Sequence, residues 1–200
     1  LVAARELSGY IGDAFSNGGE FRLTDNACTE KDGSRANLSI TKDTTIDLNG
    51  HTLTISKAEQ YFDVHEGAKL TIMDSSNSIQ DTESTVTGNV YGNKAKLEND
   101  TLTYYITTST PTDTGTTETL VKHTVPLTGV GKILCQGASA QAILVKGALE
   151  LRSGVLQNTG GQLIFTVDRG TLDVNGGYIV GGGSDAPGGG IFVTGGAEKG

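Results

Sequence analysis

Apolar and polar residues alternate in short runs along most of the chain, and glycine-containing corners separate the runs. In "IDLNGHTLTI", residues 46–55, Ile and Leu alternate with polar residues until the pattern breaks at Asn49-Gly50. Asn-Gly between two such runs is a strong signal for a two-residue β-hairpin. It also suits a corner at which the chain bends and continues, because both residues tolerate a positive φ. Recurrence of the pattern decides between the two.

The pattern recurs with the period of a solenoid. Its copies are "FDVHEGAKLTIMD" (62–74), "ILVKGALELRSGVL" (143–156), "FTVDRGTLDVNGGYI" (165–179) and the partial copy "IFVTGGA" (191–197). Val145, Val167 and Val193 hold equivalent places, 22 and 26 residues apart. Short strands and glycine corners at such a period predict stacked coils. A hairpin meander does not explain a corner that recurs once per coil, and the Leu-x-x-Leu-x-Leu-x-x-Asn frame of leucine-rich repeats is missing.

Aligning the copies predicts which residues stack between coils. Residues 48–53 match residues 174–179, which places Asn49 and Asn175 in one column, where their amides can bond neighbouring coils. The same alignment places Asp47 and Asp173 in one column.

On these motifs the chain resembles the right-handed parallel β-helix proteins of the pectate-lyase-like superfamily. More narrowly, it resembles the β-helical segments of large surface proteins from Gram-positive bacteria. The matching motifs are "DLNGHTL", "EGAKLTI", "VKGALEL", "DRGTLDVNGGYI" and "GGGIFVTGGA", over roughly residues 36–75 and 130–200. The resemblance implies an all-β, right-handed, single-stranded parallel β-helix. It implies no particular activity, because one fold hosts many functions.

We expect one domain, which looks like a fragment of a longer chain. Its predicted parts are an N-terminal cap and first strand (1–35), coils (36–75), an insertion with a β-hairpin (76–130) and further coils (131–200). Apolar residues at roughly helical spacing in 1–17 suggest a short amphipathic cap over the unpaired backbone groups of the first coil. In the insertion, two alternating threonine-rich runs flank a turn at 111–115, which favours a hairpin over a disordered linker.

Composition excludes several classes of partner. The net charge of -8 and the pI near 4.8 argue against binding of nucleic acid, which needs a basic face. No apolar run approaches the ~18 residues that a membrane-spanning helix needs. Cys28 and Cys135 lie about three coils, or ~14 Å, apart by our alignment, so we expect two free thiols and a buried Cys135.

Catalytic and metal-binding patterns are weak. Five charged residues fall at coil positions: Asp47, Asp63, Asp168, Arg169 and Asp173. We interpret them as solvated surface residues and therefore expect no catalytic residues. The three histidines are scattered and suggest no shared metal. The glycine-rich stretch 181–190 occurs once and reads as a corner loop. We therefore expect no cofactor and no metal site, although the acidity of the chain leaves calcium open.

The function expected from this pattern is adhesin-like: a non-catalytic, secreted or cell-surface module that presents a binding face to a host or glycan ligand. Insertions in solenoids often form such faces, and aromatic rings stack on sugars and proteins. The candidate ligand-binding residues are Tyr91, Tyr104, Tyr105 and His123, and the second candidates are the corner residues His65, Lys146 and Arg169. Expected partners are an extracellular glycan or host protein and the adjoining domains of a longer chain. The alternatives are a β-helical polysaccharide lyase or glycoside hydrolase and a purely structural stalk.

Overall fold

A computed structural model describes residues 3–56, 59–76, 79–86, 95–113, 115–136, 141–159, 165–181 and 191–194. The chain divides into two compact units, residues 1–76 with 130–200, and residues 77–129. Apart from the 3-10 turn η1 (Ala14–Asn17), every regular element among the described residues is a β-strand. No helix in the described part of the chain has the length and apolar character needed to cross a membrane.

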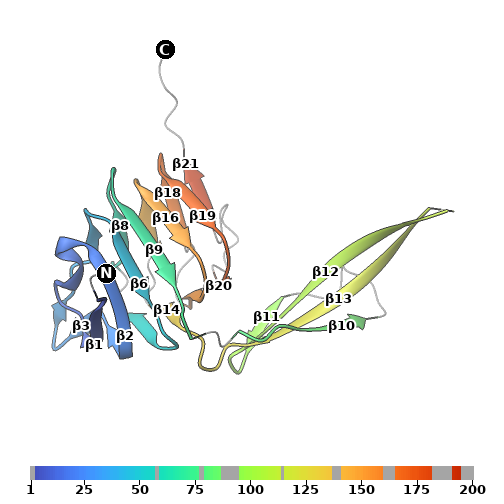
Figure 1. Cartoon of the computed structure of the whole chain (residues 1–200), viewed down its shortest axis with the longest axis horizontal. Coiled ribbons are helices and arrows are strands. Elements are labelled where there is room, and N and C mark those ends of the chain that lie inside the picture. Colours follow the sequence, from blue (N-terminus) through green and yellow to red (C-terminus); the bar gives the residue numbers. More distant parts are fainter. Residues whose placement is uncertain are drawn as a thin grey trace, which may run out of the picture. The chain divides into compact units, whose positions relative to one another are not determined.

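The first unit is a parallel β-solenoid with three strands in each coil (Figure 1). One face contains β6 (Thr44–Asp47), β9 (Lys69–Met73), β16 (Ala148–Leu151) and β19 (Thr171–Val174). The second contains β7 (Thr52–Ile55), β14 (Lys132–Cys135), β17 (Val155–Asn158) and β20 (Tyr178–Gly181). The third contains β5 (Ser39–Ile40), β8 (Phe62–Val64), β15 (Ile143–Val145), β18 (Phe165–Asp168) and β21 (Ile191–Thr194). The predicted all-β fold with stacked parallel coils is confirmed.

The long strand β2 (Gly19–Cys28) joins the first two faces into one curled sheet. Its first residues pair with β6 and its last residues pair with β7, both in parallel. Together with β1 (Arg5–Tyr10), which also pairs with β2, ten strands form one sheet, while the third face is a separate sheet of five. A short antiparallel pair, β3 (Glu30–Lys31) and β4 (Ser34–Arg35), follows β2.

Inward-facing residues stack in register from coil to coil. On the third face Val64, Val145, Val167 and Val193 are successive partners, as the repeat predicts. Val64, Val145 and Val167 are buried, and so is Leu149 on the first face. Each coil thus adds one layer to a continuous apolar core, which is the main stabilising contribution of such a fold.

Asn49-Gly50 is a corner between two faces of one coil. Asn49 and Gly50 have φ values of 47° and 80°, and the strands on either side, β6 and β7, both run parallel to β2. The hairpin alternative is therefore wrong at this position. A left-handed backbone conformation is one that glycine and asparagine adopt more easily than other residues.

The predicted column of Asn49 and Asn175 is wrong. Val174 aligns with Leu151, Ile72 and Ile46 across the first face, so Asn175 aligns with Asp47. After the corner the alignment holds, because Tyr178 is in register with Thr52. Five residues separate Ile46 from Thr52, whereas only three separate their counterparts Val174 and Tyr178, and this difference of two residues shifts the column. The shared column of Asp47 and Asp173 is wrong for the same reason, since Asp173 aligns with Thr45.

The N-terminal segment is extended where its spacing suggested a helix. Strand β1 (Arg5–Tyr10) runs parallel to β2, with an irregularity in the register between Leu7 and Gly9. Gly9 and Gly12 have φ values of 59° and 50°, which an α-helix cannot accommodate. Phe15 in η1 is fully buried and packs edge-on against Phe21, with ring centroids 5.0 Å apart. The segment thus adds a strand and an aromatic side chain to the N-terminal end of the core.

Both cysteines are free, as predicted, with Cys135 buried. Burial raises the pKa of the Cys135 thiol to about 12, so it behaves as a small apolar residue. Only one strand, β7, separates β2 from β14, so the thiols lie two coil steps apart and not the three expected. Two steps of ~4.8 Å still exceed the reach of a disulfide.

In the second coil, Asp74 lies at the corner where the chain leaves the solenoid to form the second unit and where it later re-enters the solenoid. One oxygen of its buried carboxylate accepts a hydrogen bond from the Gly50 amide, and the other accepts one from the Gly131 amide, each at 2.8 Å. The Ser76 hydroxyl donates a third bond at 2.8 Å. The backbone of Asp74 also bonds the Ser153 hydroxyl of the next coil. The carboxylate of Asp74 therefore joins both ends of the interrupted corner to each other and to Gly50 of the preceding coil, while the Asp74 backbone bonds the following coil.

The second unit is an antiparallel sheet in the order β10-β13-β12-β11 (Figure 1). Its strands are β10 (Thr82–Val86), β11 (Lys96–Glu98), β12 (Thr101–Thr112) and β13 (Gly115–Pro126). The predicted hairpin is confirmed, because β12 and β13 pair along their whole length with Pro111 opposite Thr116. The sheet is wider than predicted, since β10 and β11 add a strand at each edge.

Removal of residues 75–130 tests whether the coils fold without the second unit. The variant joins Asp74 to Gly131 and leaves Met73-Asp74-Gly131 as a corner of the same length as Arg152-Ser153-Gly154. We expect a soluble protein that keeps a β-rich circular dichroism spectrum and melts cooperatively, because coils contact only their neighbours. Aggregation, or loss of a cooperative transition, would show that the second unit is part of the core.

Replacement of Asp74 by Ala tests the carboxylate that holds the corner. It leaves the half-buried amide of Gly50 and the buried amide of Gly131 without their acceptor, so we expect the free energy of unfolding to fall by about 2–4 kcal/mol. Urea denaturation followed by circular dichroism measures the change. Asp173→Ala removes an exposed carboxylate from the same unit and should change stability by less than about 0.5 kcal/mol. Equal effects of the two substitutions would refute the role of Asp74.

Candidate functional site

A row of three side chains crosses the antiparallel sheet of the second unit. His123 in β13 lies directly opposite Glu83 in β10 on one side and Tyr104 in β12 on the other. Alternation along the strands places all three on the same face of the sheet, because residues opposite each other in an antiparallel pair share a face. The rings of Tyr104 and His123 are stacked, with centroids 4.5 Å apart and planes inclined by 5°.

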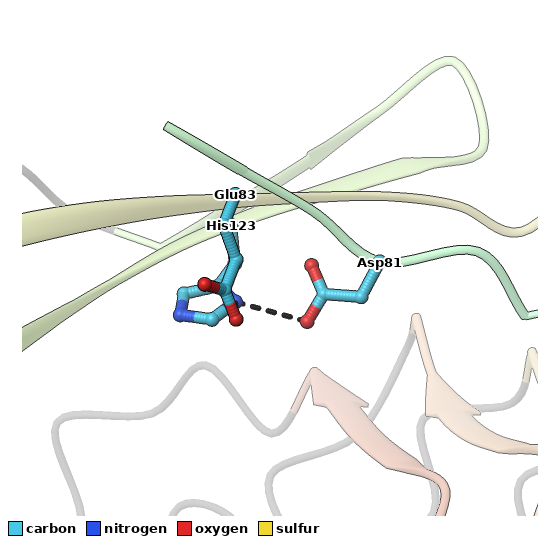
Figure 2. A group of neighbouring side chains, drawn as sticks. All are labelled: Asp81, Glu83 and His123. Carbon is cyan, nitrogen blue, oxygen red and sulfur yellow. Dashed lines mark hydrogen bonds and ion pairs between the residues drawn. The ribbon is translucent and has the colours of Figure 1, made fainter. Parts of the chain in front are cut away.

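Asp81, just before β10, completes this cluster (Figure 2). One of its carboxylate oxygens lies 2.9 Å from Nδ1 of His123 and accepts a hydrogen bond of 3.1 Å from the Tyr104 hydroxyl. The Glu83 carboxylate lies 3.8 Å from the same His123 nitrogen. The His123 side chain is 9% exposed, whereas those of Asp81 and Glu83 are 30% and 67% exposed. The cluster therefore opens toward solvent through its carboxylates.

The structure brings two of the four predicted ligand-binding residues together. Tyr104 and His123 form the stacked pair, and Ile106 on the same face is 45% exposed. Tyr105 follows Tyr104 in β12 and so faces the opposite side of the sheet. Tyr91 lies outside the described residues. Since little of His123 reaches the surface, its contribution to a binding face is to support the ring of Tyr104.

Sequence reasoning missed Asp81 and Glu83. The sequence "DTESTV" alternates weakly and carries no apolar stripe, so nothing in it predicts a strand beside the hairpin. The sequence offers no signal for these two residues, because only the register of β10 against β13 reveals that Glu83 lies opposite His123. Among the described residues, Asp81, Glu83 and His123 are the group with ligand atoms close enough to hold a metal ion, all within 4.8 Å of one another.

On the coils, Asp63 in β8 and His65 at the corner that follows lie near Lys146, which belongs to the next coil. Lys146 Nζ lies 3.1 Å from the Asp63 carboxylate. Nε2 of His65 lies 2.8 Å from the Ser39 hydroxyl and 3.4 Å from Asp63. A serine–histidine–aspartate triad needs the serine and the aspartate at different ring nitrogens, and here both approach Nε2. The arrangement is that of a surface hydrogen-bond network.

The other acidic coil residues do not converge. Asp47 lies 3.6 Å from Arg22 and accepts bonds from Ser75, while Asp168 pairs with its neighbour Arg169 at 3.4 Å. Asp173 is exposed on β19. A glycosidase needs two carboxyl groups on either side of one bond. Asp47 and Asp168 lie in separate ion pairs on different strands, and Asp173 lies on a third strand.

The most strongly shifted carboxyl on the coils is Glu150 in β16. Its side chain is 12% exposed and lies 2.7 Å from Arg152 and 2.5 Å from Lys69. Hydrogen bonds from Arg152 and then Lys69 lower the pKa of Glu150 to about 2, and the same contact raises the pKa of Arg152. A carboxyl that stays ionised and doubly paired is suited to holding neighbouring strands together, and it is a poor proton donor or base near neutral pH.

Comparisons of the chain with protein-family models, with curated proteins and with solved structures found no match. The geometry of its own residues therefore carries the functional argument.

Glu150→Gln tests the ion pairs on the coil surface through their dependence on pH. Because the pKa of Glu150 is lower in the folded protein than its ordinary value of 4.5, its contribution to stability is present above that value. It is lost as the pH falls toward about 2. We expect Glu150→Gln to be less stable than the parent at neutral pH, with the difference shrinking through this window.

Urea denaturation midpoints measured from neutral pH down to about pH 2.5 follow the difference. Glu66→Gln, which removes an exposed carboxylate at a corner of the same unit, is the control. A difference between Glu150→Gln and the parent that is independent of pH would contradict the ion-pair account.

Proposed function

We propose that the chain is a non-catalytic, secreted or cell-surface module of adhesin-like function that binds a glycan on the antiparallel sheet of its second unit. The observation that carries the proposal is the stacked pair of Tyr104 and His123, anchored by the Asp81 carboxylate. An aromatic ring held before the ligand arrives loses little conformational freedom on binding, which favours affinity. Its surroundings combine an apolar side chain, Ile106, with the carboxylates of Asp81 and Glu83.

This combination suits a sugar. The face of a pyranose ring is apolar and stacks on aromatic rings, whereas its hydroxyl groups need hydrogen-bond acceptors at the edge. Tyr104 provides a ring, and Asp81 and Glu83 provide partly exposed carboxylate oxygens within the same cluster. A protein partner would use a larger apolar patch, and Ile106 is the one large apolar side chain of the described part of this unit that is clearly exposed.

The family assignment belongs to the same proposal. We place the solenoid unit in the right-handed, pectate-lyase-like β-helix superfamily, near the β-helical segments of Gram-positive surface proteins. Three strands per coil, inward stacks of valine, leucine and isoleucine, and a glycine-containing corner in each coil support this placement. The members of this superfamily include enzymes, so the placement alone does not select the function.

Pairing of the coil charges supports a non-catalytic role. Glu150, Asp63 and Asp47 each lie within an ion pair with a lysine or arginine, and the pKa of Glu150 is lowered and not raised toward neutrality. A general acid or base for glycosidic cleavage requires a pKa near the working pH. The proposed role is therefore that of a rigid support carrying a binding sheet.

A glycan array probed with the purified protein, followed by titration of the best glycan, tests the proposal. We expect Tyr104→Ala to weaken binding about fivefold, since stacking on an aromatic ring contributes about 1 kcal/mol beyond the buried area. Tyr105→Ala, on the opposite face of the same strand, is the matched control and should change affinity less than about twofold. The variant lacking residues 75–130 should not bind.

Other outcomes would replace the proposal. Undiminished binding by the variant lacking 75–130 would move the ligand face to the coil corners that contain His65, Lys146 and Arg169. Release of unsaturated products or new reducing ends from acidic glycans would identify a polysaccharide lyase or hydrolase. Binding to host proteins alone would replace the glycan, and no binding on glycan and host-protein arrays would leave a structural stalk.

A further inference from the structure

The geometry points to a binding site for a divalent transition-metal ion, of which Zn²⁺ is the reference, formed by Asp81, Glu83 and His123 (Figure 2). The site concerns a cation and not the glycan, and it stands whether or not the proposed function is correct. It differs from the expectation drawn from the sequence, in which the histidines suggest no metal.

The spacing of the three ligand atoms fits such an ion. Zn²⁺ binds imidazole nitrogen and carboxylate oxygen at about 2.0–2.2 Å, which in a tetrahedral site separates the ligand atoms by about 3.3–3.5 Å. Nδ1 of His123 lies 2.9 Å from Asp81 and 3.8 Å from Glu83, and all three ligand atoms lie within 4.8 Å of one another. Small side-chain rotations of the two exposed carboxylates are enough to reach the ideal spacing.

The charges of the cluster call for a cation. Two carboxylates converge on one imidazole, and among the described residues no lysine or arginine lies within ion-pair distance of Asp81 or Glu83. The carboxylates of the coils differ in this respect, since Asp47, Asp63 and Glu150 each have a lysine or arginine partner. A divalent ion would balance the two negative charges and replace the single hydrogen bond between Asp81 and His123 by three coordinate bonds.

Neighbouring groups hold the ligands in place. The Tyr104 hydroxyl donates a hydrogen bond to Asp81, and its ring packs flat against His123. Such contacts orient metal ligands and fix the tautomer and ring position of the histidine. With only three protein ligands, the ion would keep at least one position for water, which is typical of an open site.

The donor set selects the class of ion. Ca²⁺ and Mg²⁺ prefer six or more oxygen ligands or several waters, and a histidine nitrogen is a poor ligand for them. One nitrogen and two carboxylates suit zinc and its neighbours in the first transition series. The site should therefore bind Zn²⁺ in preference to Ca²⁺.

Titration of the full chain, free of any affinity tag, with Zn²⁺ in competition with a chromophoric chelator tests the site. We expect one ion per chain. Glu83→Gln removes an exposed ligand with little risk to folding and should weaken binding at least tenfold. Glu118→Gln, an exposed carboxylate of β13 away from the cluster, should leave affinity unchanged. Excess Ca²⁺ should not displace the zinc.

A second measurement keeps the test independent of any one variant. Zn²⁺ should raise the melting temperature of the parent and of Glu118→Gln, because binding to the folded state alone stabilises it. Glu83→Gln and Asp81→Asn should give a much smaller rise at the same zinc concentration, with circular dichroism confirming that both are folded. Equal zinc affinity of Glu83→Gln and the parent, or the absence of saturable binding by the parent, would overturn the proposal.

Discussion

Register between successive coils is the constraint on which the rest of this structure depends. Each inward residue must lie over its counterpart one strand spacing away, because the apolar core consists of these columns. Val64, Val145 and Val167 satisfy this on the third face, and Ile46, Ile72 and Leu151 satisfy it on the first. Corners are then free to vary in length, provided that the chain re-enters the next strand in register. The five residues between Ile46 and Thr52 and the three residues between Val174 and Tyr178 both allow this.

The same constraint explains how the second unit is accommodated. A corner that can lengthen by two residues can also receive a whole sheet, if both ends are held at the positions that the coil requires. Asp74 does this with a buried carboxylate that binds the amides of Gly50 and Gly131. The chain leaves after the first face of its coil and returns at β14, in register with β7 and β17.

Strand periodicity was readable from the sequence, whereas exact alignment across corners was not. The valine column and the hairpin follow from patterns that repeat or alternate, and both are confirmed. The column of Asn49 and Asn175 fails because a corner has no periodicity, so a two-residue difference in length leaves no local signal. The helix predicted for the N-terminal segment is wrong. Leu7 and Ile11 fit a helical spacing, but the backbone conformations of Gly9 and Gly12 are incompatible with a helix.

The candidate site was only half predictable. Tyr104 and His123 are an aromatic residue and a histidine on two runs in which apolar and polar residues alternate. Their pairing follows from the hairpin that these runs form. Asp81 and Glu83 come from a polar segment 40 residues or so before His123, and pairing of β10 with β13 alone brings them together. Sites formed by non-local strand pairing are hard to read from a sequence, because no local pattern records which strand a polar segment will join.

The central claim is that the coils support a ligand face on the sheet of residues 77–129. Hydrogen–deuterium exchange of the full chain, with and without a saturating concentration of the best glycan from the array, tests it most directly. The account predicts slower exchange on binding in peptides that cover β10, β12 and β13, and unchanged exchange in the coil strands. Protection confined to the coil corners around His65, Lys146 and Arg169 would contradict it.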